Sequence, residues 1–194
     1  YEFRLEAATL LVGEPPAQVF ERAGELARLG QWEPAAAEFA RALKVYPVDH
    51  WPWYRSGALR AYLNDAEEYR EHCRSMLDLF GDTADPYIAE RVGKLCLLLP
   101  GTPDERRAVQ LCEKSLKLQP DVPWFHLAAA IASYRSGQYQ EALVRLRTGE
   151  ALAGDQLFCC VLNDLFRAMS QHQLGEREAA EGSLDEGRNR LYTR

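Results

Sequence analysis

The chain has 194 residues, of which 47% are apolar and 27% are charged, and its formal net charge is −6. This composition is that of an ordinary soluble domain. A nucleic-acid partner is not expected, because binding to phosphates needs a surplus of Lys and Arg. A membrane span is not expected either, because the uncharged apolar runs, such as Cys96 to Pro100, are far too short to cross a bilayer.

The first fourteen residues are expected to hold one helix. Apolar residues are frequent there and a Gly-Glu-Pro-Pro segment follows; they are Phe3, Leu5, Ala7, Ala8, Leu10 and Leu11. We predict that residues 1–14 are the second helix of a truncated earlier unit. The chain begins with Tyr1 and shows no signal-peptide pattern, so we expect a piece excised from a longer polypeptide.

From residue 15 onward the sequence repeats itself. The position of Phe39 recurs at Cys73, Cys112, Leu146 and Leu184, in steps of 34, 39, 34 and 38 residues. Residues that tolerate a left-handed backbone, and so end helices well, recur in phase; they are Gly30, Asn64, Gly101, Gly137 and Gly175. The pattern predicts five helix–turn–helix units, at about 15–48, 49–84, 85–121, 122–155 and 156–194.

Local signals support helices in these units. Between residues 31 and 45, apolar side chains recur at the three- and four-residue spacing of one helical face. Helix starts are predicted at Asp85-Pro86 and at Asp121-x-Pro123. There the Asp side chain would accept from free amides, and proline needs no donor in the first turn.

Several segments resemble tetratricopeptide repeats. Two of them are similar to the centre of such a repeat: Leu29-Gly30-Gln31-Trp32-x-x-Ala35 and Ser136-Gly137-Gln138-Tyr139-Gln140-Glu141-Ala142-Leu143. The repeat pattern is also matched by Trp53-x-x-x-Gly57 and by the closing Pro47 and Pro120. The resemblance covers about residues 15 to 192. It implies an all-α fold, a right-handed superhelix of antiparallel helix pairs with about ten helices, formed as a single array over residues 1–194.

The array also resembles the repeat regions appended to protein kinases and other multidomain proteins in planctomycete-like bacteria. The segments that carry this resemblance are Asn64-Asp65-x-x-x-Tyr69-Arg70, Phe80-Gly81-Asp82-Thr83-x-Asp85-Pro86, Ala89-Glu90-Arg91 and Cys96-Leu97-Leu98-Leu99-Pro100. Three features depart from the repeat pattern. Tyr69 stands where a small residue is usual, the third unit carries extra residues, and Gly182 and Gly187 are expected to loosen the last helix.

No catalytic, metal or cofactor site is expected. The five cysteines have irregular spacing, which argues against both a disulfide scaffold and a zinc site; they are Cys73, Cys96, Cys112, Cys159 and Cys160. We expect buried thiols in a reducing, cytoplasmic compartment. Because Cys159 and Cys160 are adjacent on one helix, one of them is expected to be exposed. The histidines are scattered and no phosphate-binding loop occurs, so the chain is not expected to be an enzyme.

The resemblance implies a binding surface on the inner, concave side of the superhelix. Trp53 falls at a packing position, whereas Trp51, Tyr54 and Trp124 fall on the inner face, where packing and binding roles both stay open. The inner positions are Phe20, Arg28, Trp51, Tyr54, Tyr62, Tyr87, Glu90, Lys94, Trp124, Leu127, Tyr134 and Arg135, with His172 at one end. The clamp that other family members use for chaperone C-termini is not expected, because Phe20 and Gly24 occupy its first-unit positions.

The expected function is a protein-interaction scaffold whose concave face binds a protein or peptide segment with apolar anchors and acidic groups. The best-formed repeat suggests a division of roles, in which Trp124 takes an apolar anchor and Arg135 forms a fork with a carboxylate. The alternative is a structural spacer or self-association module of a larger multidomain protein, possibly a kinase, with no free peptide ligand.

Overall fold

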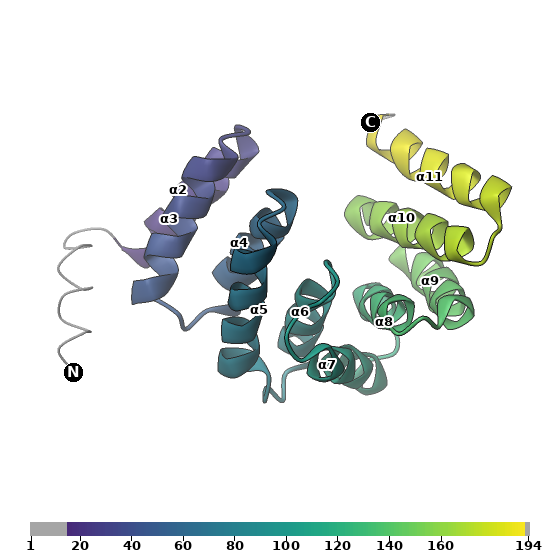
Figure 1. The fold of residues 1–194 in the computed structure, drawn as a ribbon, viewed down its shortest axis with the longest axis horizontal. Helices are drawn as coiled ribbons and strands as arrows, with labels where there is room; N and C mark the ends of the chain where they lie inside the picture. Colours follow the sequence, from purple (N-terminus) through teal and green to yellow (C-terminus); the bar gives the residue numbers. More distant parts are fainter. Residues whose placement is uncertain (1–14, 193–194) are drawn as a thin grey trace. The chain divides into compact units, whose positions relative to one another are not determined.

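The computed structural model describes residues 15–192, and this part of the chain contains ten α-helices and no strand (Figure 1). The helices are α2 (Pro16–Arg28), α3 (Trp32–Val45), α4 (His50–Tyr62), α5 (Ala66–Phe80), α6 (Pro86–Cys96), α7 (Glu105–Leu118), α8 (Pro123–Arg135), α9 (Tyr139–Ala153), α10 (Leu157–Gln173) and α11 (Arg177–Tyr192). The expected all-α fold of about ten helices is confirmed. The helix expected within residues 1–14 lies outside the described residues.

The chain divides into two compact units between Met76 and Leu77, within α5. Unit 1 contains α2, α3, α4 and most of α5; unit 2 contains the end of α5 and α6 to α11. Consecutive helices pack against each other as pairs, such as α2 with α3, α6 with α7, α8 with α9 and α10 with α11. The limits predicted for the five repeats fall between helices, and the division into five repeats stays a prediction.

Five short turns have the left-handed backbone that the repeat pattern predicts. The φ angles are 73° at Gly30, 76° at Gly101, 74° at Gly137, 80° at Gly175 and 56° at Asn64. Only Asn64 among them has a side chain, and asparagine is one of the few residues that adopts this conformation readily. The turn positions are therefore correct.

The two predicted helix caps have different outcomes. Asp85 accepts hydrogen bonds from the backbone amides of Tyr87 and Ile88 and so caps α6 as predicted. The cap predicted at Asp121 is wrong: α8 does begin at Pro123, but Val122 occupies the cap position and no side chain bonds there. Asp121 lies one residue too early to take that position.

Small residues lie where helices approach closely. Ala35 and Ala142 are fully buried. A Cβ atom on Gly93 of α6 would lie 2.7 Å from the carbonyl oxygen of Ala108 and 2.6 Å from the sulfur of Cys112, both in α7. The Trp53 side chain is buried as expected. The repeat pattern thus identifies the packing positions of both units.

All five cysteines are buried, as expected for small apolar residues, and none of them forms a disulfide bond within residues 15–192. The expectation that Cys159 or Cys160 is exposed is wrong, since both are buried. Helix α10 packs on α8, α9 and α11, so that adjacent residues of α10 each meet a neighbouring helix. Adjacent side chains of a helix point in directions about 100° apart, and three packed neighbouring helices can cover both of them.

Replacing Ala142 with leucine is expected to destabilise unit 2 by about 1–3 kcal/mol. Ala142 is fully buried on α9, which packs along α8, so the larger side chain has no free volume. The free energy of unfolding from urea titration measures the effect. Val144→Leu, at a half-exposed site on the same helix, is the control, and an Ala142→Leu variant as stable as that control would contradict the packing assignment.

Candidate protein-binding surface

Unit 1 carries an aromatic groove, by which we mean the open hollow of about 390 Å³ between α2, α3 and α4. Its lining is mainly apolar and consists of Gly24, Ala27, Arg28, Trp32, Phe39, Tyr54, Arg55, Ala58, Leu59 and Tyr62. Three of the predicted site residues, Arg28, Tyr54 and Tyr62, line this groove. Two more, Phe20 and Trp51, line an adjoining hollow that shares Phe39 and Arg55 with it.

The rings of the aromatic groove and of the adjoining hollow are paired and yet accessible. The centroids of Trp32 and Tyr62 are 4.8 Å apart, and those of Trp51 and Tyr54 are 5.8 Å apart in an edge-on arrangement. Despite these contacts, Tyr62 is 65% exposed and Trp51 is 44% exposed. Large rings that are held in place and still accessible lose little conformational freedom when a partner covers them.

Two arginines border the groove. The Arg28 guanidinium is paired with Glu25 one turn earlier on α2. Arg55 was not among the predicted residues. Its guanidinium lies 5.8 Å from the centre of the Trp51 ring, and within residues 15–192 no carboxylate pairs with it. Arg55 also lines the hollow that holds Phe20 and Trp51, and a second adjoining hollow formed by Arg55 and polar residues of α2. It is therefore the cation common to all three hollows. Its place on α4, next to Tyr54, is the signal that could have identified it.

In unit 2, three of the residues predicted on the inner face are inaccessible. Leu127 is fully buried because α8 packs against both α6 and α10. Lys94 and Glu90, one turn apart on α6, form an ion pair in which each side chain is 5% exposed. Their assignment to an open binding surface is therefore corrected: the neighbouring helices cover Leu127, and the Lys94 ammonium is already paired.

Arg135 is not available for its expected role, whereas the expected role of Trp124 stays a prediction. Arg135 donates from Nε to the carbonyl oxygen of Leu97 at 2.7 Å and from Nη2 to that of Leu98, so its fork is already occupied. The ring of Trp124 lies over the Lys94 ammonium at 4.5 Å, and its indole N–H donates to Gln156 at 2.9 Å. Trp124 is half-buried, so part of the ring stays accessible.

The remaining predicted residues of unit 2 stay at least partly accessible. Tyr87 is 42% exposed and packs edge-on against Phe125, with 5.0 Å between ring centroids. Tyr134 is half-buried between Tyr139 and Phe166, and His172 is exposed. The accessible rings of unit 2 are therefore isolated from one another and lie among side chains that already interact within the chain. Unit 1, in contrast, has an open apolar groove.

Three solved structures share this arrangement of helices. One is TTC0263, a thermophilic TPR protein of Thermus thermophilus, with a TM-score of 0.63 and 16% identity over 89% of this chain and 90% of that chain. The chain has the tetratricopeptide-repeat fold. The TPR fold is also that of YrrB, described as a TPR protein with an unusual peptide-binding site, with a TM-score of 0.51 and 14% identity over 96% of this chain and 91% of that one. PilW, a type IV pilus biogenesis factor, has a TM-score of 0.61 and 20% identity over 89% of this chain and 77% of that chain.

Comparison with protein-family models and with curated proteins finds no match to this TPR-fold sequence. No helix within residues 15–192 is both long enough and apolar enough to cross a membrane.

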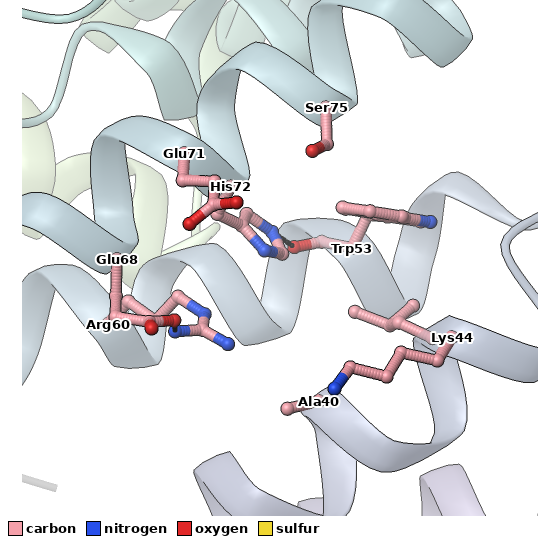
Figure 2. Close-up of a pocket in the computed structure, with 9 residues that line it drawn as sticks. Ala40, Lys44, Trp53, Arg60, Glu68, Glu71, His72 and Ser75 are labelled. Carbon is pink, nitrogen blue, oxygen red and sulfur yellow. Dashed lines mark hydrogen bonds and ion pairs between the residues drawn. The ribbon is translucent and has the colours of Figure 1, made fainter.

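Unit 1 of this TPR fold has a further hollow, of about 400 Å³, between α3, α4 and α5 (Figure 2). His72 of α5 is buried there, with its ring 4.8 Å from that of Trp53 and its Nε2 2.7 Å from the Trp53 carbonyl oxygen. Because a carbonyl only accepts, Nε2 carries the proton in the neutral ring. Burial, assisted by the nearby Arg60 cation, lowers the pKa of His72 from 6.5 to about 4.

The polar side chains of this further hollow form no recognisable catalytic group. Arg60 is paired with Glu68, and the remaining polar lining is Lys44, Glu71 and Ser75. Among the described residues no group of three His, Cys, Asp or Glu side chains could hold a metal ion. Burial raises the pKa of the Cys112 thiol, and raises that of Cys159 to about 11, so these two thiols are protonated and unreactive at neutral pH.

Proposed function

We propose that this protein is a scaffold of the tetratricopeptide-repeat family, and that the aromatic groove of unit 1 binds a segment of a partner protein. The observation that carries the proposal is the groove itself: an open, mainly apolar hollow lined by the exposed Tyr62 ring, with the exposed Trp51 ring in the adjoining hollow. Such a surface suits an apolar anchor residue, since burial of its side chain is favourable and the rings are already positioned.

The positive charge of Arg55 indicates a second property of the partner segment, namely an acidic residue. Arg55 has no carboxylate partner among residues 15–192 and lines the groove together with the adjoining hollows. A carboxylate near the apolar anchor could form two parallel hydrogen bonds with this guanidinium. We therefore propose a partner segment with an apolar or aromatic anchor and an acidic residue close to it.

The proposed contact residues differ from the predicted set. In unit 1 they are Phe20, Arg28, Trp51, Tyr54 and Tyr62, with Arg55 added. In unit 2 the partly exposed rings of Tyr87, Trp124 and Tyr134 stay in the proposal, whereas Glu90, Lys94, Leu127 and Arg135 leave it. The proposed partner is a protein or peptide, and neither nucleic acid nor lipid is proposed.

Replacing Tyr62 with alanine, or Arg55 with alanine, is expected to weaken binding of the partner segment by about 1–3 kcal/mol each. A peptide library displayed on phage and selected on the full chain would supply the segment, and titration calorimetry would measure its affinity for each variant. The selected peptides are expected to share an apolar anchor and an acidic residue.

Matched controls are available on α11. Tyr192→Ala removes an even more exposed tyrosine, and Arg188→Ala removes an exposed arginine, both far along the sequence from the groove. Selected peptides that bind all four variants with equal affinity would place the interface elsewhere. Failure to select any peptide, together with self-association of the chain in sedimentation experiments, would instead support the spacer or self-association module.

A further inference from the structure

Helix α11, the last helix within residues 15–192, fully buries no large apolar side chain, and its Leu184 is half-buried. Its buried residues are the small Ala180, Ser183 and Gly187. Its larger apolar residues near the end, Leu191 and Tyr192, are 50% and 83% exposed. Because the hydrophobic contribution scales with the apolar area buried, these contacts stabilise the position of α11 only weakly.

Charged groups supply the attachment instead. Arg190 of α11 donates from Nε to Oδ2 of Asp164 on α10 at 2.7 Å, and from Nη2 to Oε1 of Glu150 on α9 at 2.8 Å. Arg167 of α10 binds the same two acids, at 2.7 and 2.6 Å. These four residues form the charge cluster at which α9, α10 and α11 meet.

Arg167 also reaches α11 directly. It pairs with Glu186 and donates from Nε to the Ser183 hydroxyl oxygen at 3.1 Å, and that hydroxyl donates to Gln171 at 2.7 Å. Gly187 permits the close approach: a Cβ atom there would lie 3.2 Å from Cβ of Asp164. The glycine expected to loosen this helix thus allows it to rest on the charge cluster.

The charge cluster is costly to keep buried. The Asp164 side chain is fully buried, and the loss of hydration raises its pKa although two arginines contact it. When α11 leaves, Asp164 regains water, which offsets part of the lost ion-pair energy. Attachment through partly exposed charges is also weakened by salt, since Arg190 is 37% exposed and Glu186 is 60% exposed.

We infer that α11 is a releasable helix, which docks on α9 and α10 through the charge cluster and swings away at the Gly175 turn while α8 to α10 stay folded. Release uncovers the face of α10 around Val161 and Asp164. This releasable helix lies in unit 2, and the inference is independent of the binding role proposed for the aromatic groove of unit 1.

Hydrogen exchange of the full chain, followed by mass spectrometry, tests this inference. In low salt the amides of α11 are expected to exchange at least about tenfold faster than those of α8 and α9. Arg190→Gln, or 0.5 M sodium chloride, is expected to accelerate α11 by a further factor of about ten without changing α8 and α9. Arg188→Gln is the control, because Arg188 pairs, at 3.6 Å, with Asp185 of the same helix.

Two results would overturn the inference. The first is exchange of α11 at the rate of α8 and α9 in every condition, which means that unit 2 opens as a whole. The second is an Arg190→Gln variant whose α11 exchange equals that of Arg188→Gln, which means that the charge cluster does not hold the helix.

Discussion

Replacing Lys94 with methionine is expected to destabilise unit 2 by about 3–5 kcal/mol. The ammonium of Lys94 pairs with Glu90 in a place where both side chains are 5% exposed, and it also lies beneath the Trp124 ring. Methionine keeps most of the apolar stem but leaves the Glu90 carboxylate buried without its cation. Urea denaturation followed by circular dichroism measures the loss.

A double variant separates the charge effect from packing. Glu90→Gln combined with Lys94→Met removes both charges and is expected to recover most of the lost stability, because no buried ion remains unpaired. Arg28→Met is the matched control, since Arg28 and Glu25 form an exposed pair that should contribute less than about 1 kcal/mol. A loss for Lys94→Met as small as that of this control would contradict the interpretation.

The second large effect concerns pH. The pKa of His72 is about 4 in the folded chain, against 6.5 for an ordinary histidine, so between these values the unfolded chain binds one proton more. The stability that neutral His72 provides is fully present above pH 6.5 and is lost as the pH falls toward 4. The shift corresponds to a loss on the order of 3 kcal/mol.

Replacing His72 with glutamine should remove this dependence, since an amide N–H can still donate to the Trp53 carbonyl oxygen but does not titrate. The measurement is the free energy of unfolding of both proteins at several pH values from 4 to 7. The difference between them should shrink or reverse as the pH falls. His172→Gln, at an exposed position, is the control, and equal pH dependence of all three proteins would show that His72 is hydrated in the folded chain.

The helices, their turns and their packing positions could be predicted from the sequence, because each depends on nearby residues. Gly30 and Asn64 were identifiable because few residues adopt a left-handed backbone, and Ala142 because its spacing repeats that of Ala35. Such turn and packing residues can be recognised in the sequence because they recur with a period of about 34 residues.

The candidate site was less predictable, because accessibility depends on which helices meet. Leu127 falls on the expected inner face of α8, yet α6 and α10 cover it. Arg135 was expected to be available, yet it bonds to carbonyl groups of Leu97 and Leu98 that are free only because the chain leaves helix α6 at Cys96. Arg55 was missed because its position next to Tyr54 indicates which face it lies on but does not show that it lacks a carboxylate partner.

The packing of each helix on its near neighbours bears on how the chain forms during synthesis. Within residues 15–192 the main helix–helix contacts join elements at most two apart in the sequence. A polypeptide with such local contacts closes only short loops as it folds, and short loops close quickly. Each helix pair can therefore pack as it leaves the ribosome, before the following pair has been translated.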